Sequence, residues 1–103
     1  MASLLIVDDE RQLTDAFADF FERHEGHTVT RAYTGEDAIA AFHAARPDLV
    51  LLDMWLPDMT GFDVYTRIRE QSPVVIMIGG EGDTSHVVQA RQRGAEKIGR
   101  AHV

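Results

Sequence analysis

Two short apolar runs, each followed directly by acidic residues, constrain this chain more than any other feature. The run at 4–7 leads into Asp8 and Asp9, and the run at 49–52 leads into Asp53. Runs of this length and composition are typical of strands buried in a parallel sheet. If the two strands are neighbours, the three carboxylates meet at one sheet edge. Two such charges about 4 Å apart repel by about 4 kcal/mol at an effective dielectric of about 20, so the cluster favours a bound cation.

The residue types at this edge point to Mg²⁺ as the cation. Mg²⁺ prefers hard oxygen ligands, keeps several waters, and joins one or two carboxylates to a phosphate oxygen. The chain has no cysteine, which excludes thiolate metal sites and a disulfide scaffold. We therefore predict a Mg²⁺ site at Asp8, Asp9 and Asp53, able to place a phosphate next to one of its own aspartates.

Composition limits the class of protein and of partner. The chain has 103 residues, of which 45% are hydrophobic, which suits one small domain with a thin core. Its formal net charge of -7 argues against direct nucleic-acid binding by this segment, which would need a basic face. No apolar stretch is long enough to cross a bilayer, and the N-terminus lacks a signal-peptide pattern. We expect a cytoplasmic protein whose partners are proteins or small anions, with no membrane contact.

Strand-length apolar runs alternate with helix-length amphipathic segments along the chain. Strands are predicted at about 3–7, 28–32, 48–53 and 74–79, and helices at about 10–23, 35–45, 61–71 and 84–94. This order predicts an α/β fold, a flavodoxin-like doubly wound parallel sheet with strand order 2-1-3-4-5. Ligands of such sheets bind between the first and third strands, where the acids lie. In the first helix, Phe20 and Phe21 are expected to be core residues.

Three motifs together are specific to one family. They are Ile-Val-Asp-Asp-Glu at 6–10, Asp-Met-Trp-Leu-Pro-Asp-Met-Thr-Gly at 53–61, and Val-Ile-Met-Ile at 75–78 followed by Gly-Glu-Gly-Asp at 80–83. With these motifs the chain resembles, over residues 3–96, the receiver domain of two-component response regulators, which accept a phosphoryl group from histidine kinases in a phosphorelay.

The resemblance assigns a role to each acid. It implies that Asp53 is the phospho-acceptor, and that Asp9 and Asp53 bind Mg²⁺ directly. Asp8 would help through water, and the backbone carbonyl of Trp55 would be a further metal ligand. The expected partner is a histidine kinase or a phosphotransfer protein, and the domain is expected to be a signalling acceptor rather than an enzyme.

The chain departs from the family pattern where the phosphoryl group would be sensed. Receivers place Thr or Ser at the switch position that ends the fourth strand, and here that position is Gly79. The lysine that ends the fifth strand aligns with Ala101, and the aromatic switch residue aligns with Ile98. A phosphorylated form is therefore expected to show little conformational output.

The C-terminal end carries a separate expectation. Residues 98–103, Ile-Gly-Arg-Ala-His-Val, match in every codon the translation of a common sequencing-adapter read. We hypothesise that the receiver domain spans 1–97 and is truncated, and that 98–103 is a non-native tail. The fifth strand and last helix would then be incomplete or missing, together with a C-terminal effector domain.

Two alternative functions stay open. A haloacid-dehalogenase-type phosphohydrolase also uses Mg²⁺ and an aspartate at a strand end, but it has a second acid two residues later, where this chain has Trp55. The departures at Gly79 and Ala101 suggest instead a degenerate receiver that acts only as a protein-binding module. Phosphorylation of Asp53 in the presence of Mg²⁺ would separate these readings.

Overall fold

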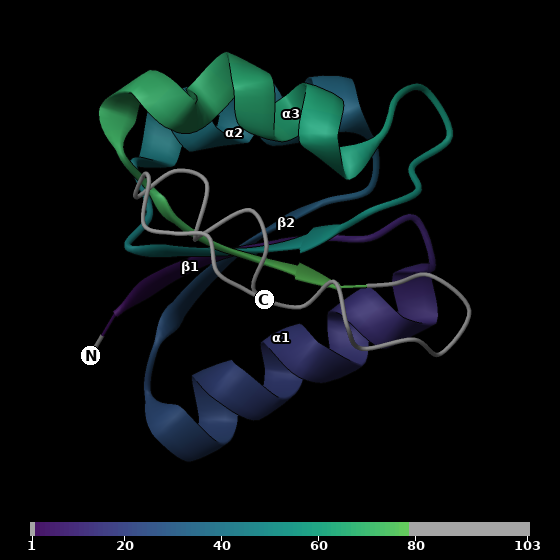
Figure 1. Ribbon diagram of the computed structural model, residues 1–103. Coiled ribbons are helices and arrows are strands. Elements are labelled where there is room, and N and C mark those ends of the chain that lie inside the picture. Colours follow the sequence, from purple (N-terminus) through teal and green to yellow (C-terminus); the bar gives the residue numbers. More distant parts are fainter. Residues whose placement is uncertain (1, 79–103) are drawn as a thin grey trace.

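The computed structural model describes residues 2–78, which form one sheet flanked by helices. Its elements, in chain order, are β1 (Ser3–Val7), α1 (Arg11–Glu25), β2 (Thr28–Ala32), α2 (Gly35–Ala45), β3 (Leu49–Asp53), α3 (Gly61–Ile68), the 3-10 turn η1 (Arg69–Gln71) and β4 (Val74–Ile78). The four strands are parallel and lie in the order β2-β1-β3-β4. Helix α1 covers one face of the sheet, and α2 and α3 cover the other (Figure 1).

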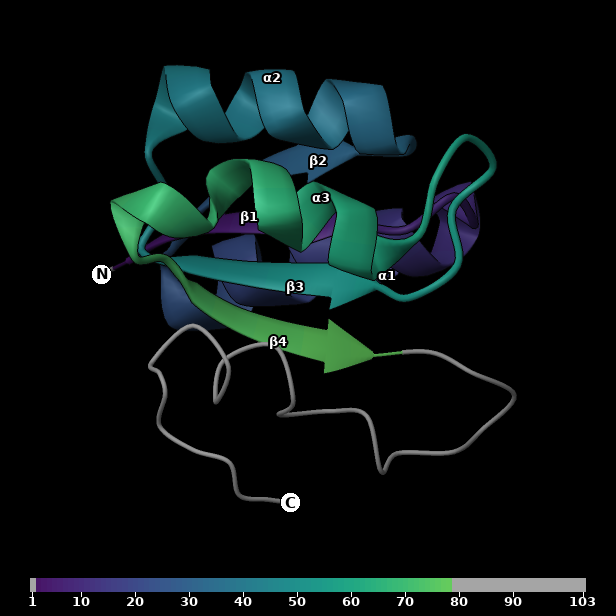
Figure 2. The same cartoon turned by 45° about the horizontal axis from the view of Figure 1, so that its top comes forward.

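This topology confirms the predicted order for the first four strands. β1 lies between β2 and β3, and β4 pairs with the other side of β3 (Figure 2). In the β1–β3 register Val7 is opposite Leu52, so the two acid-bearing strands end at the same edge. The predicted fifth strand, the helix at 84–94 and the tail at 98–103 lie outside the described residues.

The larger core lies between the sheet and the pair of helices α2 and α3. Alternate strand residues enter it because successive side chains of a strand point to opposite faces. Its strand members are Leu5, Val7, Ala32, Val50, Leu52, Val75 and Met77, and its helix members are Ala38, Phe42, Val64, Tyr65 and Ile68. The intervening β1 residues Leu4 and Ile6 are also buried, as expected of a parallel sheet covered on both faces.

The buried side of α1 differs from the sequence prediction. The fully buried residues of this helix are the small ones, Thr14 and Ala18. Phe20 is 47% exposed and Phe21 is only half-buried, so the expectation that both are core residues was wrong. Helical spacing identifies the apolar stripe of the helix. The side that packs closely against the sheet, however, is the one that carries the small residues beside this stripe. The larger residues Leu13, Phe17 and Phe20 then lie at the solvent side.

Helix ends follow local signals. The hydroxyl of Thr34 accepts a hydrogen bond from the Asp37 backbone N–H at the start of α2. Helix α3 begins with a complete capping box between Thr60 and Asp63. The predicted third helix continues to residue 71 only as η1, because the chain turns at Ser72 before Pro73. Within residues 2–78 no helix is both long and apolar enough to cross a membrane.

Candidate metal centre

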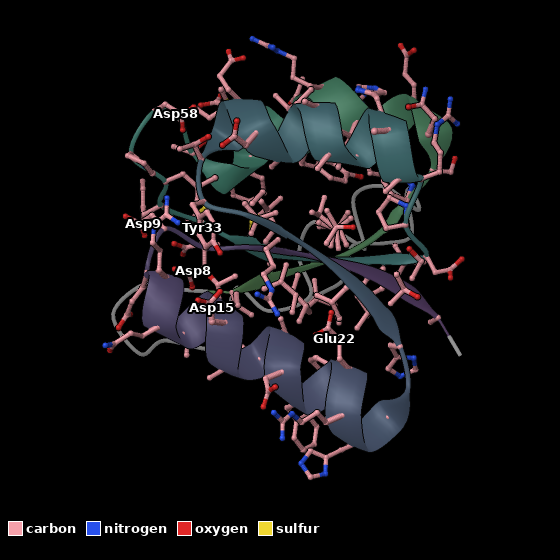
Figure 3. The ribbon with its side chains drawn as sticks, turned by 180° about the vertical axis from the view of Figure 1, so that it is seen from behind. Asp8, Asp9, Asp15, Glu22, Tyr33 and Asp58 are labelled. Atoms are coloured by element: carbon pink, nitrogen blue, oxygen red, sulfur yellow. The ribbon has the colours of Figure 1, made fainter. Side chains whose placement is uncertain are left out.

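The three acids predicted to share a site come together at the carboxyl edge of the sheet. Asp53 is the last residue of β3, and Asp8 directly follows β1. One carboxylate oxygen from each of Asp8, Asp9 and Asp53 lies within 4.8 Å of the others. Asp8 and Asp53 are each 9% exposed, whereas Asp9 is exposed. Figure 3 shows Asp8 and Asp9 beside the first turn of α1, so the cluster opens to the surface at this edge.

Backbone and side-chain bonds hold Asp8 in place. Its N–H donates to the carbonyl of Ala32 (3.1 Å), which extends the β1–β2 pairing by one residue. Its carboxylate accepts from the N–H of Glu10 (3.0 Å). Its carbonyl accepts from the hydroxyl of Thr14 (2.9 Å), which is fully buried. The Thr14 contribution was not predicted, because a threonine inside a helix gives no sequence signal for a bond to the preceding loop.

Asp53 is held by the strand that carries it and by the loop that follows. Its carboxylate accepts a hydrogen bond from the backbone N–H of Trp55 (3.3 Å). The next residue, Met54, still pairs with β4 through its N–H to the carbonyl of Ile78 (2.8 Å). Helix α3 starts close by at Gly61, where a Cβ atom would lie 2.6 Å from the Asp53 carbonyl oxygen. The glycine is therefore required for this approach.

Burial and mutual repulsion make the cluster electrostatically unfavourable when it is fully charged. Burial, followed by the charge of Asp8, raises the pKa of Asp53 from 3.8 to about 6. Burial also raises the pKa of Asp8, against the lowering effect of the Glu10 N–H, and the charge of Asp9 adds to the rise. A divalent cation would relieve both effects. These hard oxygen donors in a cluster of like charge fit the predicted Mg²⁺.

Trp55 lies two residues beyond Asp53 at the start of the β3–α3 loop, which we define as residues 54–60. Its side chain is 59% exposed, and its backbone forms an antiparallel bridge with Thr60. The bridge is closed by Leu56 N–H to the Met59 carbonyl (3.1 Å) and by Gly61 N–H to the Met54 carbonyl (2.7 Å). These bonds do not use the Trp55 carbonyl, the group predicted as a metal ligand.

The predicted switch residues cannot be placed. Gly79, together with Ala101 and Ile98, lies outside the described residues. The expectation of weak conformational output therefore stays a prediction.

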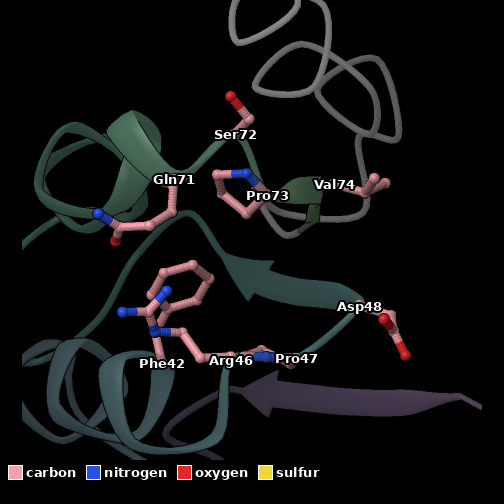
Figure 4. Close-up of a pocket in the computed structure, with 8 residues that line it drawn as sticks. All are labelled: Phe42, Arg46, Pro47, Asp48, Gln71, Ser72, Pro73 and Val74. Carbon is pink, nitrogen blue, oxygen red and sulfur yellow. The ribbon is translucent and has the colours of Figure 1, made fainter.

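A pocket lies away from the acids. Its lining residues are at the C-terminal end of α2 and the entry into β3, and at η1 and the entry into β4 (Figure 4). They are Phe42, Arg46, Pro47, Asp48, Gln71, Ser72, Pro73 and Val74. The entries of parallel strands are at the edge opposite their carboxyl ends, so this pocket is separate from the aspartate cluster.

Comparison with known proteins agrees with the motifs. The family model described as the response regulator receiver domain matches residues 4–98. The Mycobacterium bovis sensory transduction protein RegX3 is 41% identical over 90 residues, which cover 85% of this chain and 39% of RegX3. The probable transcriptional regulatory protein TcrX of Mycobacterium tuberculosis is 44% identical over 71 residues, covering 69% of this chain and 30% of TcrX. The chain thus spans about a third of the length of these relatives.

Solved structures show the same architecture. NtrX from Brucella abortus superimposes with a TM-score of 0.77 at 36% identity, over 91% of this chain and 22% of NtrX. A receiver domain from Clostridium thermocellum superimposes with a TM-score of 0.78 at 26% identity, over 92% of this chain and 78% of its own. The match of the receiver model to most of the chain, with the sheet order and aspartate cluster described above, establishes that this chain belongs to the response regulator receiver family.

Proposed function

We propose that this receiver domain accepts a phosphoryl group on Asp53 from a phosphohistidine of a histidine kinase or phosphotransfer protein. The observation that carries the proposal is the cluster of Asp8, Asp9 and Asp53, whose carboxylate oxygens lie within 4.8 Å of one another at the ends of neighbouring strands. The pKa of about 6 leaves Asp53 mainly ionised at neutral pH, as a nucleophile requires.

The transfer requires little beyond positioning. An oxygen of Asp53 attacks phosphorus and forms the O–P bond while the P–N bond of the phosphohistidine breaks. The bonding electrons pass to the imidazole nitrogen of the donor. Mg²⁺, held by Asp9 and Asp53 with the Trp55 carbonyl, and by Asp8 through water, would neutralise charge on the transferring group. The Trp55 N–H, which lies 3.3 Å from an Asp53 carboxylate oxygen, orients the acceptor.

We infer that the domain is a cytoplasmic signalling acceptor and not an enzyme with catalytic turnover. Phosphohydrolases with a strand-end aspartate nucleophile need a second acid two residues later, and the exposed Trp55 stands there. The relative MtrA of Mycobacterium leprae is described as a DNA-binding response regulator, and the matched region covers 41% of it. We propose that DNA binding in such proteins resides outside the region equivalent to this acidic chain.

The proposal is tested by incubation with Mg²⁺ and acetyl phosphate, followed by intact-mass measurement. A stable gain of one phosphoryl group in the parent, absent in Asp53→Asn, is the expected result. Continuous phosphate release would favour the phosphohydrolase. No mass gain, with Mg²⁺ binding retained, would favour a degenerate receiver that only binds proteins. Trp55, the only tryptophan, reports Mg²⁺ binding by fluorescence, and Asp53→Asn is expected to weaken that response.

A further inference from the structure

The β3–α3 loop is fixed at its base by the Trp55–Thr60 bridge. Within this base the Trp55 backbone is the part next to the acceptor carboxylate, because its N–H donates to Asp53. The loop contains a proline at position 57 but no regular secondary structure between Trp55 and Thr60. The conformation of the loop tip therefore depends on contacts that the tip residues make with other elements.

The tip of this loop is bound to the start of α2. The two carboxylate oxygens of Asp58 accept hydrogen bonds from the backbone N–H groups of Gly35 (2.8 Å) and Glu36 (3.0 Å). These are the first two N–H groups of α2, which have no partner within the helix. The same two bonds lower the pKa of Asp58. The third N–H, that of Asp37, is bound instead by Thr34, which immediately precedes the helix.

Packing brings the same two segments together. The side chain of Met59 occupies the place where a Cβ atom at Gly35 would stand, so this close approach requires glycine. Met59 and Leu56 also pack against the main core from the loop side. In Figure 3, Asp58 lies by the first turn of α2, at the end of the molecule where Asp8 and Asp9 lie. The tip thus has a polar and an apolar attachment to one helix.

We propose that Asp58 is a positioning residue for the acceptor site. By fastening the loop tip to α2, it holds the Trp55 backbone in the conformation used at Asp53 and at the metal. This inference rests on the proposed function, because it concerns the same site. Without Asp58 the loop would sample other conformations. The apparent Mg²⁺ Kd would then rise in inverse proportion to the fraction of molecules whose loop is in the binding conformation.

The test compares three variants of the full chain. Asp58→Ala removes both bonds to α2, and Asp58→Asn keeps one acceptor oxygen. Thr34→Ala is the matched control, because it removes a cap from the same helix but from a residue that does not belong to the loop. Amide hydrogen exchange of the metal-free proteins is measured over residues 54–60, together with Mg²⁺ affinity from Trp55 fluorescence and the melting temperature.

Asp58→Ala is expected to accelerate exchange in the loop and to raise the Mg²⁺ Kd about threefold to tenfold, with Asp58→Asn in between. Thr34→Ala is expected to lower the melting temperature while leaving loop exchange and Mg²⁺ Kd unchanged. Equal effects of Asp58→Ala and Thr34→Ala on exchange and Kd would overturn the inference and make Asp58 only a helix cap. A parent chain without any Mg²⁺ response would instead overturn the proposed function, while exchange in the metal-free proteins would still decide whether Asp58 holds the loop.

Discussion

Asp53 shows how a single residue can be costly to the fold and useful to the site. Burial and the neighbouring Asp8 raise its pKa from 3.8 to about 6. In the unfolded chain the carboxyl ionises near its ordinary pKa, whereas in the folded protein it ionises only near pH 6. The protonated form of Asp53 therefore contributes its full share of folding stability below about pH 4. This contribution is lost as the pH rises through about 6.

Asp53→Asn is accordingly expected to stabilise the metal-free protein at neutral pH. The full pKa change corresponds to at most about 3 kcal/mol, and solvent screening at this edge of the sheet reduces the gain to about 1–2 kcal/mol. Chemical denaturation in EDTA at about pH 7.5 and about pH 4.5 measures it, and the advantage should shrink at the lower pH. A variant no more stable than the parent at the higher pH would show that the cluster carries no such strain.

The position of the acids after apolar runs was sufficient to predict part of this site. Asp8, Asp9 and Asp53 could be predicted to meet because each follows an apolar run, and parallel strands bring their carboxyl ends together. Thr14 and Asp58 could not, because their partners lie on other segments. The carboxylate of Asp58 binds N–H groups more than twenty positions earlier in the chain, and no spacing rule connects them.

At the scale of elements, the start of α3 depends on how closely it approaches β3. A Cβ atom on Gly61 would lie 2.6 Å from both the Asp53 carbonyl oxygen and the Met77 sulfur. Gly61→Ala should therefore destabilise the domain by about 1–3 kcal/mol, because the backbone of β3 cannot easily move. It should also slow phosphorylation of Asp53, since relief of the contact shifts the end of that strand.

Gly26 offers a matched control for this prediction. It ends α1 at φ 71° with no atom within 4 Å of an added Cβ, so Gly26→Ala meets only the backbone cost of about 1 kcal/mol. Melting temperatures and acetyl phosphate labelling rates of the two variants are compared with those of the parent. Equal labelling rates in both variants would contradict a link between the start of α3 and the acceptor.

The elements themselves were largely predictable, and their buried faces less so. The described strands and helices fall within a few residues of the predicted ranges, because apolar runs, caps and prolines act locally. Which side of α1 faces the sheet is decided by fit. Thr14 and Ala18 allow a close approach that Phe20 would prevent, and the periodicity of the sequence does not contain this information.

At the scale of the whole molecule, α1 presents an apolar surface on a chain whose formal net charge is -7, and that charge opposes association between copies. Its residues Leu13, Phe17 and Phe20 recur at helical spacing and are 37%, 38% and 47% exposed. We predict weak self-association that grows with added salt, because salt screens the repulsion between acidic chains. Phe17→Gln combined with Phe20→Gln should abolish it, as measured by sedimentation velocity.

Two further variants serve as controls for the α1 substitutions. The exposed Ala40→Gln on α2 is the control for a polar substitution on a helix surface, and it should leave association unchanged. Phe42→Ala is the control for loss of a core ring, because Phe42 is 2% exposed. It is expected to lower the free energy of unfolding by about 3–5 kcal/mol. If Phe17→Gln with Phe20→Gln cost as much, the α1 surface would be structural rather than solvent-facing.

The pairing of Val7 with Leu52 has a consequence for how the gene can change. Insertion or deletion of one residue within β1 or β3 would turn every following side chain to the opposite face of the sheet. The apolar side chains would then leave the core when the carboxylates leave the site. A one-residue insertion or deletion in these strands therefore cannot move the carboxylates and keep the protein folded. Point substitution can remove the chemistry while the fold survives, whereas length variation is confined to the connections between elements. A protein that keeps this fold therefore keeps the positions of the three carboxylates, unless those residues are themselves substituted.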